Sequence, residues 1–234
     1  DALKTGWVSN INFEPHVGQE ILTNIAASCG DLLQVRRETV MESVKKVDQA
    51  WKVVLKPLDG RRYTVTADVL IDGTELGDVA KACGVEYRIG MESSADTGES
   101  IAPAEANDII QDLTFVTILK DYGQGTDMTI PKPENYDPAH YELLLRLMEA
   151  QPDKRQLTDY FIWSRMPGRK TDVNNKGGFS TDMIGANHEY PEASYEERAA
   201  IVQAHKDYTL GLLYFVGHDD RVPEEIRTEM LRWG

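Results

Sequence analysis

The stretch A-D-V-L-I-D-G-T-E-L-G-D, Ala67–Asp78, predicts how the first part of the chain folds. Its apolar residues 69–71 predict a short strand, which stops abruptly at Asp72-Gly73-Thr74. The Gly77-Asp78 pair then opens a predicted helix. Glycine lets a ligand approach the backbone closely, and a helix N-terminus offers free N–H groups to an anion. The stretch therefore predicts a strand–turn–helix with an anion site at its turn.

A helix is predicted at the beginning of the segment that leads to this stretch. Glu14 and Pro15 suit a first helical turn, where an acid meets the positive end of the dipole and proline needs no donor. Apolar residues then recur at helical spacing until Gly30 ends the helix. Residues 32–35 predict a short strand.

Extended hairpins follow between this helix and the turn at Asp72. The predicted strands span residues 40–47, 51–56 and 61–66. Asp59-Gly60 is a strong turn signal between two β-rich runs, so the three strands form a predicted meander. The wholly apolar residues 69–71 are typical of a buried strand in a parallel sheet.

The chain changes character after Gly90. Residues 91–107 are polar and without a clear period, which predicts a long loop. The remaining expectations are a strand over 113–120, a proline-rich stretch over 123–138, a helix over 139–150 and a loop-rich region over 161–184. Ser194, with Glu197 three residues on, predicts a helix cap for a helix that runs toward Phe215, and Pro223 begins a last helix.

Composition limits the classes of partner. The 234 residues are 41% hydrophobic and 27% charged, which is ordinary for a globular protein. The net charge of −14 argues against general binding to nucleic acid, and no apolar run approaches the roughly 20 residues of a membrane span. The chain opens at Asp1 without methionine or leader, so we expect a piece of a longer protein, and its compartment stays open.

Two later motifs and the order of the first elements carry a resemblance to a known family. The motifs are N-N-K-G-G-F-S-T-D at Asn174–Asp182 and Y-P-E-A-S-Y-E-E-R at Tyr190–Arg198. With the meander and the D-G-T turn, the chain resembles the bacterial FAD-dependent oxidoreductases of the glutathione-reductase-like superfamily. The resemblance covers most of the chain. It implies an α/β fold: a partial Rossmann-like FAD-binding domain with a three-stranded meander over residues 1–90, and a mixed α+β, helix-rich substrate side over 91–234.

The resemblance also implies the cofactor, FAD, and its contacts. It assigns backbone contact with the adenine end of FAD to Val40, and proximity to the cofactor to Gly73, Thr74, Gly77 and Asp78. The alternative is that these residues only shape a sheet edge and the start of a helix.

The dinucleotide fingerprint G-x-G-x-x-G does not occur as a strand-to-helix turn in this sequence. Gly123-Gln124-Gly125 has Met128 where the third glycine belongs, and prolines follow it. We therefore expect the fingerprint before Asp1 and the family's closing FAD contact after Gly234. The chain is expected to be the middle of the enzyme, with the missing terminal segments as its partners.

A polar cluster predicts the substrate site. It comprises Arg165, Asn174, Asn175, Lys176, Ser180 and Asp182, with Arg169 and Lys170 nearby. Such residues suit an anionic or hydroxyl-rich small molecule held against the flavin, although a solvated turn would use the same residue types. The five histidines are scattered and the two cysteines lie far apart in sequence, so we expect no metal site. No catalytic residue is assigned.

Two functions follow as expectations. The first is hydride transfer between flavin and a small organic substrate, with the chemistry supplied by the cofactor. The alternative is a polysaccharide-associated binding or lyase module on a flavoprotein-like scaffold without flavin dependence, since some family members are described as xanthan lyases and fold alone does not fix function.

Overall fold

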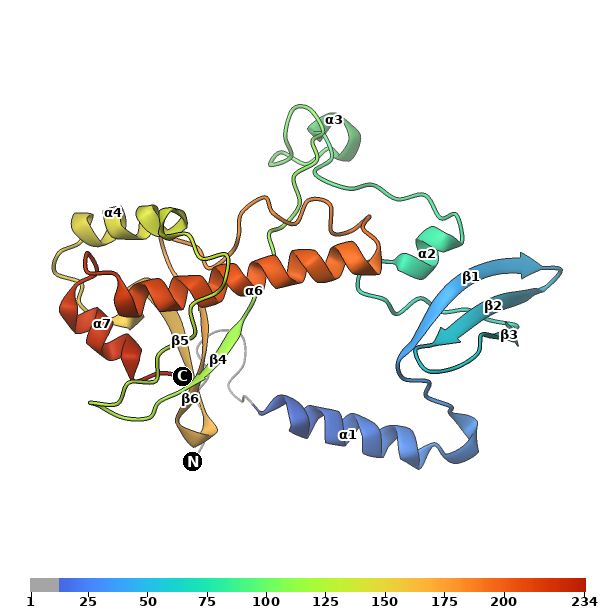
Figure 1. The fold of residues 1–234 in the computed structure, drawn as a ribbon. Helices are drawn as coiled ribbons and strands as arrows, with labels where there is room; N and C mark the ends of the chain where they lie inside the picture. The colour runs from blue at the N-terminus through green and yellow to red at the C-terminus, as the bar shows by residue number, and fades with distance from the viewer. Residues whose placement is uncertain (1–12) are drawn as a thin grey trace. The chain divides into compact units, whose positions relative to one another are not determined.

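The computed structural model describes residues 13–234, which form two compact units. The N-terminal unit is Pro15–Asn107, and the C-terminal unit is Asp108–Gly234 together with Phe13 and Glu14. Figure 1 labels most of the helices and strands of both units. Each unit is described by itself below.

The N-terminal unit is built on the predicted meander. Its helices are α1 (Pro15–Ser28), η1 (Gly30–Leu32), α2 (Asp78–Ala82) and α3 (Ser94–Thr97), and its strands are β1 (Thr39–Val47), β2 (Ala50–Pro57) and β3 (Tyr63–Ala67). The strands form an antiparallel sheet in the order β1-β2-β3, with Val53 of β2 opposite Val44 and Val65. The predicted helix and the meander are thereby confirmed.

Two predicted strands of this unit are wrong. Residues 32–35 continue from a 3-10 turn without strand pairing, and residues 69–71 form no strand. Val69 and Ile71 are 71% and 84% exposed, although their apolar character predicted burial. A parallel strand needs a neighbouring strand and covered faces, and the N-terminal unit supplies neither at this point. Within residues 13–234 both sheets are antiparallel, so they do not show a Rossmann-like parallel sheet.

The N-terminal unit buries little apolar surface. Val53 is its one buried large apolar side chain, and no residue of α1 is buried. The exposed apolar side chains of the unit include Ile21, Leu22, Ile25, Leu32, Val69, Ile71, Val85 and Ile101. Exposed apolar surface on this scale is typical of a face that packs against something else.

The C-terminal unit contains a second antiparallel sheet and the longest helix. Its strands are β4 (Thr117–Lys120), β5 (Phe161–Met166) and β6 (Lys170–Asn175), in the order β4-β6-β5. Its helices are η2 (Pro138–Tyr141), α4 (Glu142–Ala150), α5 (Leu157–Tyr160), η3 (Pro167–Arg169), α6 (Tyr195–His218) and α7 (Glu224–Leu231). The loop-rich region predicted over 161–184 is therefore wrong in its first half, which is the β5–β6 hairpin closed at Gly168 with a φ of 69°.

The hydrophobic core lies in the C-terminal unit. One sheet face contributes Leu119, Phe161 and Val173, which are buried. Against them pack buried residues of α4, α6 and α7, including Leu144, Leu212, Phe215 and Ile226. The predicted capping box of α6 is confirmed: Ser194 Oγ accepts from the Glu197 N–H at 3.3 Å, and Glu197 Oε2 accepts from the Ser194 N–H at 2.7 Å.

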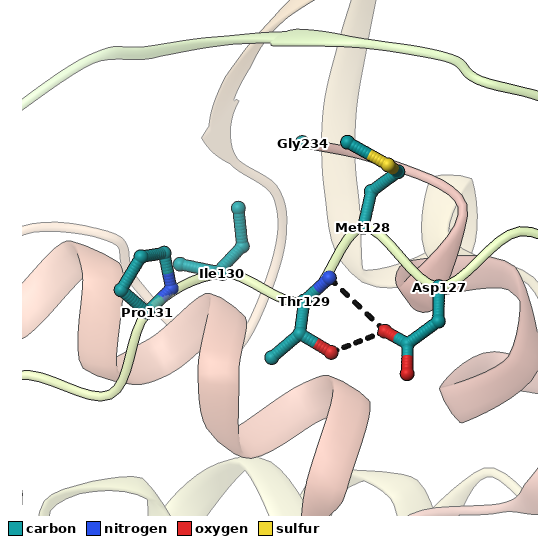
Figure 2. Close-up of a pocket in the computed structure, with 6 residues that line it drawn as sticks. All are labelled: Asp127, Met128, Thr129, Ile130, Pro131 and Gly234. Carbon is teal, nitrogen blue, oxygen red and sulfur yellow. Dashed lines mark hydrogen bonds between the residues drawn. The ribbon is translucent and has the colours of Figure 1, made fainter.

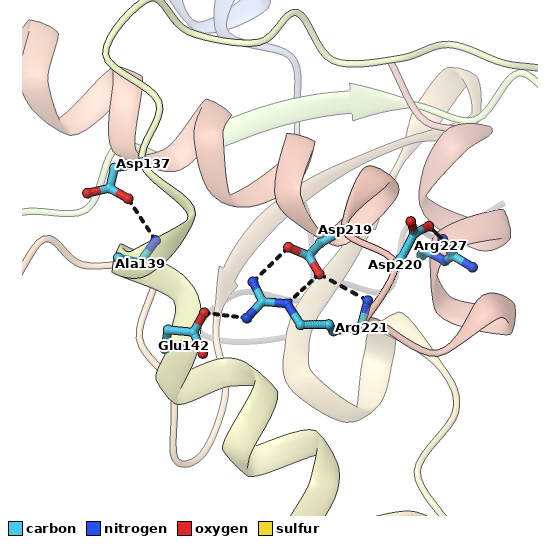
Figure 3. Close-up of polar contacts among 7 residues, drawn as sticks. All are labelled: Asp137, Ala139, Glu142, Asp219, Asp220, Arg221 and Arg227. Carbon is cyan, nitrogen blue, oxygen red and sulfur yellow. Dashed lines mark hydrogen bonds and ion pairs between the residues drawn. The ribbon is translucent and has the colours of Figure 1, made fainter.

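Arg221 ties the turn after α6 to the start of α4 (Figure 3). Its Nε and Nη2 each donate to one oxygen of Asp219 at 2.8 Å, and Nη1 donates to Glu142 Oε1 at 2.5 Å. The side-chain hydrogen bond from Arg221 holds the pKa of Asp219 below its usual range. Because half of the Arg221 side chain is exposed, this fork fixes the geometry of the turn more than it adds stability.

Candidate functional site

The D-G-T turn is closed by its own side chains. Asp72 Oδ1 accepts from the Thr74 N–H at 2.8 Å and from its hydroxyl at 2.7 Å, and Asp72 Oδ2 accepts from the Ala80 N–H at 2.8 Å. Thr74 Oγ1 in turn accepts from the Asp78 N–H at 2.9 Å. Asp72 and Thr74 therefore act as the N-terminal cap of α2, across the left-handed Gly77 with a φ of 72°.

This cap changes the expected anion site. The N–H groups of Asp78 and Ala80, which the sequence predicted as free, are already bonded to side chains of the turn. A phosphate bound there would have to displace the Asp72 carboxylate, and the negative charges of the two groups would repel each other. The turn as built does not fit the pyrophosphate of a dinucleotide.

The other expected cofactor residues lie on the same unit as this turn. Val40 lies on β1, an edge strand of the meander, and α2 packs beside that strand. Gly73 is exposed, and a Cβ built on it would meet no heavy atom within 4 Å. The unit thus offers a strand edge and an open glycine turn, which suit the approach of a neutral ring or ribose better than that of a phosphate.

We expect the Asp72→Asn substitution to loosen α2. The new amide group would place an N–H opposite either the Thr74 or the Ala80 donor, so one of these bonds is lost. Amide hydrogen exchange of Ala80 should accelerate in this variant. The control is Asp68→Asn, an exposed carboxyl four residues earlier, which should leave Ala80 unchanged.

The same cap should respond to pH. Hydrogen bonds from Thr74 and then Ala80 lower the pKa of Asp72 below its ordinary value. The carboxylate therefore stabilises the turn fully above about pH 4, the ordinary value for Asp, and this contribution is lost as pH falls through the lowered folded-state pKa. A pH titration of the Ala80 amide shift with a midpoint at or above the ordinary value would contradict this assignment.

A second polar network joins Thr114 to three side chains of the 175–182 segment, which lies more than 60 residues further along the chain. Asp182 Oδ2 accepts from Asn175 Nδ2 at 3.1 Å and from Ser180 Oγ at 2.8 Å. Asp182 Oδ1 accepts from the hydroxyl of Thr114, on the segment that leads into β4. The backbone N–H of Asp182 also donates to Ser180 Oγ at 2.9 Å. Both oxygens of this carboxylate are therefore held by neutral donors.

The network forms one wall of a polar pocket of about 440 Å³. The pocket is lined by Ile110, Gln111, Asp112, Thr114, Ile162, Asn174, Asn175 and Asp182. The Asp112 carboxylate closes a further side by accepting from the Gly185 N–H at 2.7 Å. Sequence reasoning missed residues 110–114. The signal in the sequence is weak, because Gln111, Asp112 and Thr114 stand among apolar residues just before β4.

The remaining predicted substrate residues are placed elsewhere. Lys176 Nζ donates to the Thr158 carbonyl at 2.5 Å and does not line the pocket. Arg165 is exposed and pairs in register with Thr171, whereas the pocket lies at the other end of the hairpin, where Ile162 pairs with Asn174. The structure therefore brings Asn174, Asn175, Ser180 and Asp182 together and leaves the two cations out.

Tyr208 of α6 supports the network from the core side. Its hydroxyl donates to the Ser180 carbonyl at 3.4 Å. Burial, with a smaller effect of the Asp182 charge, raises the pKa of Tyr208 to about 12. The phenol is neutral at physiological pH, so it serves as a positioning group for the 180–182 turn.

A second hollow of about 530 Å³ lies beside the loop before Pro131 (Figure 2). Asp127 accepts from the Thr129 N–H at 3.1 Å and from its hydroxyl, and these bonds, with the charge of His218, lower its pKa. The Thr129 hydroxyl lies 3.4 Å from His218 Nε2. The Asp127 carboxylate thus forms an Asx turn within its own loop, and we interpret Asp127 and Thr129 as residues that stabilise this loop.

Comparison with known proteins gives one family match. The family model described as FAD dependent oxidoreductase matches residues 2–230. A search of curated proteins found no match, and a search of solved structures found none. In the described part of the chain, no helix has the length and apolar character needed to cross a membrane. Residues 13–234 also contain no group of three or more His, Cys, Asp or Glu side chains placed to hold a metal ion.

Proposed function

Because the chain belongs to the FAD-dependent oxidoreductase family, we propose that the protein transfers a hydride between a bound flavin and a small organic substrate. The match over residues 2–230 is the observation that carries this proposal, since it spans nearly the whole chain. When bound, the flavin supplies the redox chemistry, and the residues of this chain bind and orient its partners.

In this proposal residues 1–90 form part of the FAD domain and residues 91–234 form the substrate side. The backbone of Val40 contacts the adenine end, and Gly73, Thr74, Gly77 and Asp78 lie beside the cofactor. The pyrophosphate is held elsewhere, because Asp72 caps α2 and the G-x-G-x-x-G fingerprint is not in this sequence. The exposed apolar residues of the N-terminal unit support a domain completed by further elements, with a parallel, Rossmann-like sheet as the natural arrangement.

The test is the flavin content of the full-length protein. We expect it to purify yellow, or to bind added FAD with a change in the visible flavin spectrum, and to bleach on reduction. A colourless full-length protein that does not bind FAD would overturn the proposal.

A variant tests the placement at the D-G-T turn separately. Gly73→Val adds a side chain that meets no protein atom within 4 Å of its Cβ, so the fold should be preserved while space beside the turn is filled. We expect this variant to retain FAD less well than Glu75→Val, a matched change at an exposed position of the same loop. Equal retention of FAD by the two variants would reject the placement but not the flavin function.

The alternative is a flavin-independent polysaccharide-binding or lyase module. The polar pocket beside Asp182 is the observation in its favour. It predicts that flavin-free protein binds a polysaccharide saturably, and that FAD has no effect on that binding.

A further inference from the structure

We propose that the pocket beside Asp182 takes an uncharged, polyhydroxylated molecule of the size of a monosaccharide. The inference deepens the proposed function, on which it rests in treating this ligand as the substrate. Ligand binding itself is argued from the pocket lining alone. The pocket lies wholly within the C-terminal unit.

The charges of the lining disfavour an anion. Asp112 and Asp182 both line the pocket, and no lysine or arginine does. Lys176, the nearest cation in sequence, is engaged with the Thr158 carbonyl. A carboxylate or phosphate ligand would therefore lose its hydration beside two like charges without gaining an ionic partner.

The hydrogen-bonding groups also disfavour a cation. The Asp182 oxygens already accept three side-chain hydrogen bonds, from Asn175, Ser180 and Thr114. Within residues 13–234, the side-chain amide nitrogens of Gln111 and Asn174 have no hydrogen-bond partner, although both residues line the pocket. An ammonium group only donates, so it would leave these N–H donors unsatisfied.

A hydroxyl group matches the mixed lining. Because a hydroxyl both donates and accepts, neighbouring hydroxyls of a sugar can accept from Gln111 or Asn174 and donate to Asp112. Within residues 13–234, Oδ1 of Asp112 accepts from Gly185 and Oδ2 has no partner, so Oδ2 is available to a ligand. Ile110 and Ile162 supply apolar surface for the C–H face of a sugar ring. Amides and a carboxylate over a small apolar patch are the groups that a neutral sugar requires.

The experiment is calorimetric titration of the full-length protein with three matched probes: glucose, glucuronate and glucosamine. At mildly acidic pH these differ chiefly in charge, being neutral, anionic and cationic. We expect glucose to bind about tenfold more tightly than glucuronate, whose carboxylate meets the like charges of Asp112 and Asp182. We expect a similar margin over glucosamine, whose ammonium replaces a hydroxyl that could accept from Gln111 or Asn174. Preference for glucuronate or glucosamine, or no binding of any of the three, would overturn the inference.

Two variants locate the binding in this pocket. Asn174→Ala should weaken glucose binding about tenfold, because it removes an amide donor. Asp112→Asn should also weaken the binding of glucose, but it should strengthen the binding of glucuronate relative to that of glucose, because the substitution removes one of the two carboxylates that repel the anion. Asp153→Asn, at an exposed position that does not line the pocket, is the matched control and should change neither. Unchanged glucose binding by Asn174→Ala would place the sugar elsewhere.

The flavin spectrum of the same samples separates the two proposals. Protein that holds FAD but binds no sugar would refute the substrate class and leave the redox function standing. Protein that binds glucose through Asn174 but never binds FAD would refute the redox function and retain the site.

Discussion

Replacing Phe215 by alanine is expected to lower the free energy of unfolding by about 3–5 kcal/mol. The Phe215 ring is fully buried on α6, and its centroid lies 5.2 Å from that of Tyr141. It belongs to the core that joins α6 to the sheet face carrying Phe161 and Val173. Truncation removes a large buried apolar surface and leaves a cavity, which the surrounding core residues can fill only in part because α6 is fixed along its length.

Urea denaturation followed by tryptophan fluorescence measures this effect. Trp163 and Trp233 both lie in the unit that contains α6. Val202→Ala is the control on the same helix, because Val202 is 40% exposed, and its effect should stay within about 0.5 kcal/mol. Similar losses for the two variants would mean that α6 is not packed as described.

Two glycines of α6 should respond oppositely to alanine. A Cβ at Gly211 would overlap the hydroxyl of Tyr141, which donates to the Tyr208 carbonyl at 2.8 Å. The hydroxyl must move away from that half-buried carbonyl and lose its hydrogen bond, so we expect Gly211→Ala to destabilise the protein by about 1–3 kcal/mol. At Gly217 a Cβ would meet Leu231 at an ordinary 3.4 Å, so Gly217→Ala should be neutral or stabilise by up to about 1 kcal/mol.

A double-mutant cycle identifies the cause. Tyr141→Phe alone should cost about 1 kcal/mol, because it removes one hydrogen bond. In the Gly211→Ala background the same change should be neutral or favourable, because it removes the overlapping atom. Additive effects in urea denaturation would show that the Tyr141 hydroxyl does not set the requirement for glycine.

The elements that were predictable from sequence are those with a local cause. The Ser194–Glu197 capping box fixes the start of α6, since its groups lie three residues apart and satisfy each other's backbone donors. The β1–β2–β3 meander follows from β-rich runs separated by turn residues such as Asp59-Gly60.

The wrong predictions concern segments whose structure depends on contacts with another part of the fold. Residues 69–71 have the composition of a buried strand but no partner strand in the N-terminal unit, so they form no strand and Val69 and Ile71 stay exposed. The β5–β6 hairpin was missed because its polar face, which includes Asp172 and Asn174, obscured the alternation of apolar residues. The D-G-T turn predicted an anion site, but the Asp72 carboxylate itself accepts the hydrogen bond from the Ala80 N–H that an anion would have accepted.

The meander, the capped start of α6 and the grouping of Asn174, Asn175, Ser180 and Asp182 could be predicted from sequence, since each depends on residues near one another in the chain. The family follows from the match over residues 2–230. By contrast, the packing of distant segments places Asp112 and Thr114 in the pocket beside Asp182 and leaves Lys176 and Arg165 outside it. The physical reason is distance along the chain. The Thr114–Asp182 hydrogen bond joins groups 68 residues apart, and such a pair meets only when β4 and β6 have formed their sheet.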